Sequence, residues 1–230
     1  MFSEVFLAQT YREMVDFLPK KPAYMALRFS SYGAGLSNIP PSLPKNTLLL
    51  VDDSTPVSHH NRKVVAQQLE ELVSQFSACG VLLDFQGAVT EEATDMVHAI
   101  LEALTCPVAA TEKYAKHFGC PVFLSPPPVN APLEKHLAPW LKQGVYLEIA
   151  AGAAQFVVTK DGCRTVALPP AAALPQADSA LHCHYQVEVF PEKAIFTLSR
   201  TREDLELLTQ KALDLGVRGA VGLYQELRLL

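Results

Sequence analysis

The chain has 230 residues, of which 49% are hydrophobic and 19% are charged, and its formal net charge at pH 7 is −5. This length and apolar content suffice for a large hydrophobic core and exclude an intrinsically disordered protein. The negative charge and the lack of a basic run argue against a nucleic-acid partner, because a phosphate backbone requires a positive surface. No apolar run reaches the ~18 residues of a membrane-spanning helix, which argues against a membrane protein.

The amino-terminal segment contains an early acid and no basic stretch followed by an apolar one, so it does not resemble a signal peptide. The sequence has five widely spaced cysteines, which are Cys79, Cys106, Cys120, Cys163 and Cys183. We therefore expect a cytoplasmic protein whose thiols are reduced and buried.

The predicted elements alternate between strand and helix along most of the chain. Two strands, at 24–29 and 47–51, come first and are joined by a loop rich in proline, glycine and serine. In chain order there follow a helix at 61–78, a strand at 81–86, a helix after Thr90, strands at 107–110 and 121–124, a helix at 131–143, a strand at 145–149, a helix after Thr201 and a strand at 219–224. The strands are apolar on both faces, which is typical of a parallel sheet covered by helices.

With a further strand at 194–198, the count reaches about eight, the number that closes a (β/α)8 barrel. We therefore predict one α/β domain over residues 1–230, a small TIM-like barrel; an open doubly wound sheet is the alternative. Residues 151–193 break the alternation, since Lys160-Asp161-Gly162 between two alternating segments is a strong hairpin signal. We expect an antiparallel excursion there, which either covers one mouth of the barrel or forms an interaction surface.

One predicted strand carries a family resemblance. Residues 79–86, CGVLLDFQ, resemble the signature D-G-x-D-x-D-x-E of the chitinase-like glycoside hydrolases of family 18. The matching positions are Gly80, Asp84 and Phe85, and the departures are Cys79 and Leu82 in place of the first two aspartates and Gln86 in place of the glutamate. The family has this strand fourth in the barrel, whereas the predicted elements make it third.

A second segment, residues 215–224, resembles the helix end, glycine turn and last strand that close such barrels. Tyr224 stands there where the family usually has tryptophan.

The resemblance implies a mechanism of which this chain lacks one part. In the family the glutamate protonates the glycosidic oxygen, the acetamido group of the substrate attacks the sugar carbon, and the middle aspartate orients that group. Gln86 has no proton to give near neutral pH, and general acid catalysis is worth ~10²–10⁴-fold. The resemblance therefore implies a barrel with weak hydrolytic activity or none. Asp84 and Gln86 share one face of the strand, which we expect to be the barrel interior near its carboxyl mouth.

We expect an oligosaccharide or another small polar molecule to bind at this mouth, with no cofactor. The residues predicted to line it are Asp52, Asp84, Gln86, Tyr146, Glu148 and Tyr224.

Two other functions stay open. The chain could be a hydrolase or lyase that uses Asp52, Asp53 and Glu148, with or without a metal, because catalytic groups of barrels lie at the carboxyl ends of strands. Acids at strand ends also cap turns, however, which gives these residues a structural explanation. The chain could instead be a non-enzymatic interaction protein, or a homo-oligomer, that associates through residues 151–193.

Two pairs of histidines are candidate metal ligands. His59 and His60 are adjacent and so do not face the same way, although with Asp52 and Asp84 they could surround a metal. His182 and His184 share one face of a predicted strand, a geometry that can bind zinc. No second ligand pair at a fixed spacing accompanies either, so we predict no metal site.

Overall fold

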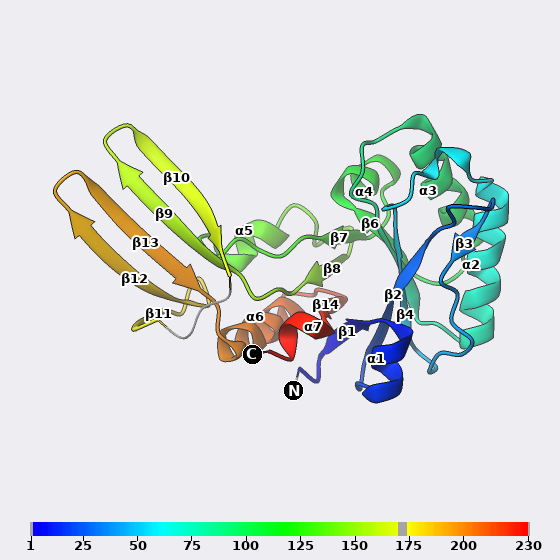
Figure 1. The fold of residues 1–230 in the computed structure, drawn as a ribbon, viewed down its shortest axis with the longest axis horizontal. Coiled ribbons are helices and arrows are strands. Elements are labelled where there is room, and N and C mark those ends of the chain that lie inside the picture. The colour runs from blue at the N-terminus through cyan, green and yellow to red at the C-terminus, as the bar shows by residue number, and fades with distance from the viewer. Residues whose placement is uncertain (1, 170–173, 230) are drawn as a thin grey trace.

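The computed structural model describes residues 2–169 and 174–229, and its main feature is a closed barrel of parallel strands (Figure 1). The strands that form the barrel, in order around it, are β1 (Val5–Gln9), β2 (Pro22–Phe29), β4 (Leu48–Asp52), β5 (Gly80–Asp84), β6 (Val108–Thr111), β7 (Val122–Leu124), β8 (Val145–Glu148) and β14 (Gly219–Leu223). The ring closes because β1 pairs with both β14 and β2. The predicted (β/α)8 barrel is confirmed.

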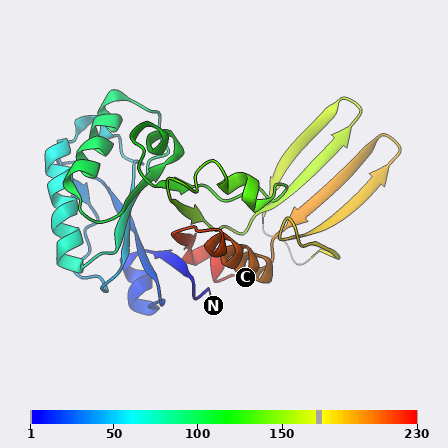
Figure 2. The same ribbon diagram turned by 180° about the vertical axis from the view of Figure 1, so that it is seen from behind.

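Helices cover the outside of the barrel (Figures 1 and 2). They are α1 (Tyr11–Asp16), α2 (Arg62–Phe76), α3 (Glu91–Ala103), α4 (Glu112–Phe118), α5 (Leu133–Leu137), α6 (Arg202–Asp214) and α7 (Tyr224–Leu227), with a 3-10 turn η1 at Val57–His59. The predicted caps of α3 and α6 are confirmed: the Thr90 hydroxyl accepts from the N–H of Ala93, and Thr201 forms a capping box with Asp204. No helix of the described chain is both long and apolar enough to cross a membrane.

The side chains of each barrel strand divide between two cores. On β5, Leu82 belongs to the small interior cluster, whereas Val81 and Leu83 belong to the large cluster between the strands and the helices. This alternation places Asp84 on the interior side, because it lies two residues after Leu82.

Two predictions about the barrel strands were wrong. The first strand is Val5–Gln9, which is not among the predicted strands; it makes β5 the fourth barrel strand. The predicted strand at 194–198 lies in β13 (Lys193–Ser199), which pairs antiparallel with two strands outside the barrel. An apolar run shows that a segment is buried in a sheet, but the choice of sheet is made by partners distant in the chain.

The helix predicted at 131–143 is also shorter than expected. It ends at Leu137, and turns follow up to Gly144. Pro139 lacks the N–H that an α-helix would use at that position, which explains the early end.

The antiparallel excursion is a five-stranded sheet that leaves the barrel after β8 and returns at α6. Its strands, in spatial order, are β10 (Gly162–Leu168), β9 (Ala153–Thr159), β13, β12 (Cys183–Phe190) and β11 (Gln176–Asp178). The turn at Lys160 and Asp161 joins β9 to β10, as predicted. Two long hairpins project away from the barrel (Figure 1), and we call this element the projecting sheet. The short strand β11 pairs with β12 at one edge of this sheet. In the barrel sheet, a short strand β3 (Leu36–Ser37) pairs antiparallel with β2.

Candidate functional site

The carboxyl ends of β4 and β5 bring two carboxylates together at the mouth of the barrel. Asp52 and Asp84 are direct neighbours in the strand register. Phe85 is fully buried on the opposite side of β5, where its ring packs against Phe29 at 5.6 Å and Tyr114 at 6.0 Å between ring centroids. Because alternate side chains point to opposite sides, this anchoring turns Asp84 and Gln86 toward the mouth.

Gln86 is held in place by two different carboxylates. Its side-chain Nε2 donates to Oδ1 of Asp84 at 2.6 Å, and its backbone N–H donates to Oδ1 of Asp53 at 2.8 Å. The N–H of Gly87 donates to the other oxygen of Asp53 at 2.9 Å. A Cβ at Gly87 would lie 2.7 Å from that oxygen, so only glycine allows this approach. The carboxamide at position 86 is therefore exposed, oriented and hydrogen-bonded to the neighbouring acid.

A small cavity of about 190 Å³ lies beside Gln86. The residues that line it are Gln86, Thr111, Glu112, Lys113, Phe123 and Ser125. The Lys113 ammonium donates to the carbonyl of Gly87, which ties α4 to the loop after β5. The cavity is smaller than the ~300–1,000 Å³ of typical ligand pockets, so it has room for only a small group.

The surroundings raise the pKa of two acids of the mouth above the ordinary values. Burial, together with the negative charges of Asp84 and Glu226, raises the pKa of Glu148 to about 7, and burial is the largest of these causes. The pKa of Asp84 is also raised: burial is the main cause, the hydrogen bond from Gln86 opposes it, and the charges of Asp52 and Asp53 add to it. Glu148 and Asp84 thus repel each other across the mouth, which disfavours the doubly ionised pair.

Not all of the predicted mouth residues lie with these acids. Asp52 does, and its Oδ1 accepts hydrogen bonds from the backbone and hydroxyl of Ser54. Tyr146 belongs to the interior core near the amino end of β8, where Gly219 is its neighbour in register. Tyr224 begins α7 and stacks on Phe17 at 5.5 Å, within the core outside the barrel strands. The structure therefore brings together Asp52, Asp84, Gln86 and Glu148.

Sequence reasoning missed one basic residue of the mouth, Arg28. It lies level with Asp52 in the register and alternates with Leu27 and Phe29, both of which are buried in the outer core. The register shifts between Tyr24 and Leu27, so simple alternation from the start of β2 assigns Arg28 to the wrong face. No sequence signal marked this irregularity.

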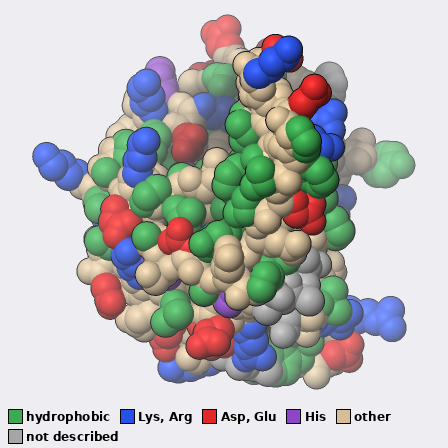
Figure 3. Space-filling view, turned by 90° about the vertical axis from the view of Figure 1, so that its left-hand side faces the viewer, with side chains coloured by type: hydrophobic (Ala, Val, Ile, Leu, Met, Phe, Trp, Pro, Cys, Tyr) green, Lys and Arg blue, Asp and Glu red, His purple; other side chains and the backbone are tan. Residues whose placement is uncertain are grey.

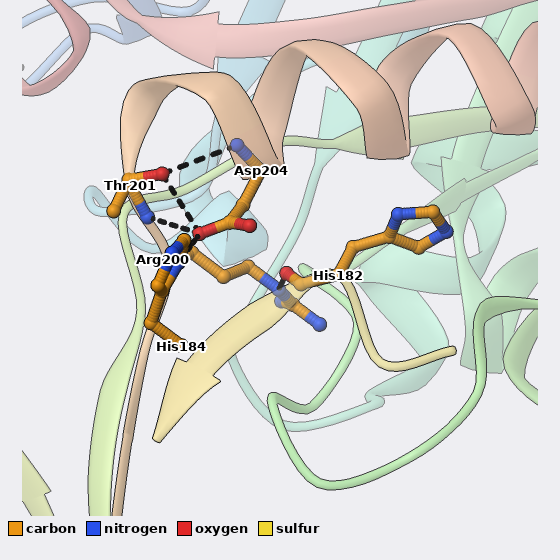
Figure 4. A network of polar contacts seen from close by, with 5 residues as sticks. All are labelled: His182, His184, Arg200, Thr201 and Asp204. Carbon is orange, nitrogen blue, oxygen red and sulfur yellow. Dashed lines mark hydrogen bonds and ion pairs between the residues drawn. The ribbon is translucent and has the colours of Figure 1, made fainter. Parts of the chain in front are cut away.

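Among the side chains that the structure describes, no group of three or more His, Cys, Asp or Glu residues is placed to hold a metal ion; the side chain of His59 lies outside them. The rings of His182 and His184 point in different directions (Figure 4). Nδ1 of His184 lies 2.8 Å from Oδ2 of Asp204, the residue that also caps α6. His60 packs against Phe29, and its Nε2 lies 2.7 Å from the carbonyl oxygen of Ser30.

Beside this pair, a buried arginine joins the projecting sheet to the mouth (Figure 4). Arg200 is only 2% exposed, and its guanidinium donates to the carbonyls of His182, Pro127 and Pro128 at 3.3, 2.6 and 3.1 Å. Pro127 and Pro128 belong to the loop after β7, at the carboxyl side of the barrel. Arg200 therefore fixes this loop to the base of the projecting sheet.

No protein-family model matches the sequence, and no match was found among curated proteins. Solved structures, however, resemble the fold. A chitinase from Chromobacterium violaceum superposes with a TM-score of 0.58 at 10% identity, over 95% of this chain and 92% of that chain. A family 18 chitinase from Cycas revoluta in complex with (GlcNAc)3 gives a TM-score of 0.56 at 10% identity, over 95% and 94% of the two chains.

A family 18 N-acetylglucosaminidase from Paenibacillus barengoltzii gives a TM-score of 0.54 at 10% identity, over 96% of this chain and 94% of that chain. At such low identity the likeness concerns the fold. The expected resemblance is confirmed at that level, because the fold superposes on these structures over nearly the whole of this chain. The chain therefore has a barrel fold like that of the family 18 glycoside hydrolases.

Proposed function

We propose that the protein binds a carbohydrate, or a similarly polar small molecule, at the mouth of a glycoside-hydrolase-like barrel, with weak hydrolysis or none. The observation that supports this is the hydrogen bond between Gln86 and Asp84. A carboxamide donates and accepts hydrogen bonds but transfers no proton near neutral pH. The position at which the family signature has its proton donor is thus occupied by a group suited to binding.

The mouth offers groups that match sugar hydroxyl and amide groups. The Asp84 and Asp52 carboxylates accept hydrogen bonds, Gln86 donates and accepts them, and Arg28 lies in register beside Asp52. The Cycas revoluta structure of similar fold holds an oligomer of N-acetylglucosamine. We therefore choose chito-oligosaccharides as the first ligand class to test.

The test is calorimetric titration of the protein with tri-N-acetylchitotriose. We expect the wild type to bind, and Gln86→Leu to weaken binding by about fivefold to tenfold, since a lost hydrogen bond in a binding site costs about 1–1.5 kcal/mol. Gln75→Leu is the matched control, because Gln75 is an exposed glutamine of α2, remote from the mouth. Absence of binding by the folded wild type, or equal loss in both variants, would refute carbohydrate binding at this site.

A second function is favoured by one observation, the raised pKa of Glu148. A carboxyl group with a pKa of about 7 is half protonated near neutral pH, which is what a general acid requires. We infer that Glu148 could act as the acid and Asp84 as the second carboxylate of a hydrolase. Glu148 is one of the residues named in the alternative prediction of a hydrolase or lyase. Asp53, which that prediction also names, accepts hydrogen bonds from the backbone N–H groups of Gln86 and Gly87.

The two functions are distinguished by hydrolysis of a chromogenic chito-oligosaccharide. If Glu148 is the acid, the wild type turns over the substrate, Glu148→Gln loses ~10²–10⁴-fold in rate, and Gln86→Leu retains most of it. If the protein only binds, neither the wild type nor Glu148→Gln is active, while Gln86→Glu restores the missing proton donor and gains activity.

A further inference from the structure

Across β10, β9, β13 and β12, one face of the projecting sheet carries no charged side chain; Asp178 of β11 lies on the same side, at the base. Cross-strand pairs define three rows across four strands, each running from β10 through β9 and β13 to β12. From tip to base, the rows are Cys163, Val158, Ala194 and Val189; Thr165, Phe156, Phe196 and Val187; and Ala167, Ala154, Leu198 and Tyr185. We call these twelve residues the apolar face.

The opposite face of the same strands differs in chemistry. Its rows contain Arg164, Glu188 and Lys193 among glutamines, threonines and aliphatic residues such as Val157 and Ile195. The charges of these four strands are therefore confined to this second face. The apolar face is the one that another surface can bury without leaving an unpaired charge.

Only the base of the apolar face is covered within the described chain. Leu198 is 7% exposed and packs with Val129 and Cys183 in a small core of its own. Toward the tip, Val187 is 38% and Val189 is 79% exposed, and both belong to the apolar face. Figure 3 shows hydrophobic side chains gathered on the projecting sheet. A sheet with an apolar face is stable when a second layer covers it, so the outer rows lack their expected partner.

We propose that the apolar face is covered by the same face of a second copy of this chain. A face without charge is complementary to itself, because pairing two copies buries no unpaired charge. The sheet projects clear of the barrel (Figure 1), so two copies can overlap their sheets across a two-fold axis with the barrels at opposite ends. Two stacked antiparallel sheets about 10 Å apart are a common way to bury such faces.

The area available decides the strength of this association. A fully exposed aromatic side chain has a surface of ~150–250 Å², and a valine has somewhat less. Since the outer residues of the apolar face are only partly exposed, we estimate that the face exposes on the order of 600 Å² per copy. Both copies together would bury ~1,200 Å², which is the lower limit for specific interfaces. We therefore expect a weak dimer that forms with rising protein concentration and not an obligate one.

The test is sedimentation equilibrium of the full chain from about 1 µM to about 1 mM, a range that covers weak dissociation constants. We expect the average mass to rise from 25.1 kDa toward twice that value. Val187→Lys places a charge on the apolar face and should weaken the dimer at least tenfold, because an unpaired buried charge is costly. Gln186→Lys is the matched control: Gln186 directly precedes Val187 in β12 and lies on the opposite face, and the substitution adds the same charge.

Circular dichroism and thermal melting of both variants check that they are folded, which is expected because both positions are exposed. A dimer that Val187→Lys dissociates and Gln186→Lys leaves intact supports the proposal. A wild type that is monomeric at every protein concentration overturns the proposal, and the apolar face would then have to bind a different protein. A dimer that persists in Val187→Lys also overturns it, and points to the exposed edge strand β10. This test is independent of sugar binding, so either proposal can fail alone.

Discussion

Asp53 fixes the backbone of Gln86 from the neighbouring strand end. Its Oδ1 lies 2.8 Å from the N–H of Gln86, while its other oxygen takes the N–H of Gly87 at 2.9 Å. The chain leaving β5 is therefore positioned by an acid that follows β4, and Gln86 reaches Asp84 as a consequence. Asp53 is one of the predicted catalytic candidates; its contacts make it a positioning residue for the mouth.

Asp53→Ala should loosen this loop. Two charge-assisted hydrogen bonds at a half-exposed site are lost, and we expect the free energy of unfolding to fall by about 1–2 kcal/mol. Hydrogen exchange at the amides of Gln86 and Gly87 should accelerate at the same time. Asp95→Ala, which removes an exposed ion pair with Arg62 on the helices, serves as the control and should cost less than ~1 kcal/mol. Unchanged exchange in Asp53→Ala would contradict the positioning role.

Gly80 is a residue of the signature-like strand at which close packing leaves no room for a side chain. A Cβ there would lie 2.9 Å from the carbonyl oxygen of Pro107 and 3.3 Å from Cδ1 of Leu48. Gly80→Ala should therefore push β5 away from β6 and lower the free energy of unfolding by about 1–3 kcal/mol. In Gly33→Ala the nearest atom would be Oγ of Ser30 at 3.6 Å, so this control should be tolerated. Chemical denaturation of the pair measures the difference; equal stability would show that the strands can adjust.

Arg200→Met should uncouple the projecting sheet from the mouth. The substitution keeps an apolar stem but leaves the carbonyls of His182, Pro127 and Pro128 without their donor. We expect a loss of about 3 kcal/mol, which for a chain of this size corresponds to a fall of ~6–12 °C in melting temperature. Arg164→Met, at an exposed position of β10, should shift it by no more than ~2 °C. Similar melting temperatures for the two variants would show that water replaces the guanidinium.

Glu148 should make stability depend on pH in a defined direction. Its folded pKa, about 7, lies above the ordinary value of 4.5, so between these values the folded state binds more protons than the unfolded chain. Stability is therefore lost as pH rises from about 4.5 to about 7 and stays lower above it.

In Glu148→Gln this loss is absent. The variant and the wild type should be similar near pH 4.5, and the variant should be more stable at pH 8, by on the order of 2 kcal/mol after allowance for solvent screening. Thermal melts at the two pH values measure this difference. The control is Gln75→Glu, because Gln75 is exposed on α2 and this substitution should leave the dependence of stability on pH unchanged. Gln143→Glu would not serve, because the Gln143 side chain donates a hydrogen bond to the carbonyl of Ala115.

Local rules accounted for most elements of the fold. The caps of α3 and α6, the hairpin turn before Gly162 and the strand at 81–86 all depend on residues close in the chain, and the structure confirms them. The strand at 194–198 was assigned to the wrong sheet and Val5–Gln9 was missed, because strand pairing joins residues that are far apart in the sequence. Alternation of side chains correctly predicts that Asp84 and Gln86 share one face. On β2 the same rule gives the wrong face for Arg28, because the register shifts between Tyr24 and Leu27.

By itself, the sequence determined the alternating α/β pattern, the signature-like strand and the presence of a carboxamide at position 86. These follow from periodicity and residue identity, which act over one strand or helix. Only the tertiary structure decided that Asp52, Asp84, Gln86 and Glu148 share the mouth while Tyr146 and Tyr224 lie elsewhere. It also decided that the apolar rows of the projecting sheet stay largely uncovered, since convergence and burial are set by which strands pair and in what register.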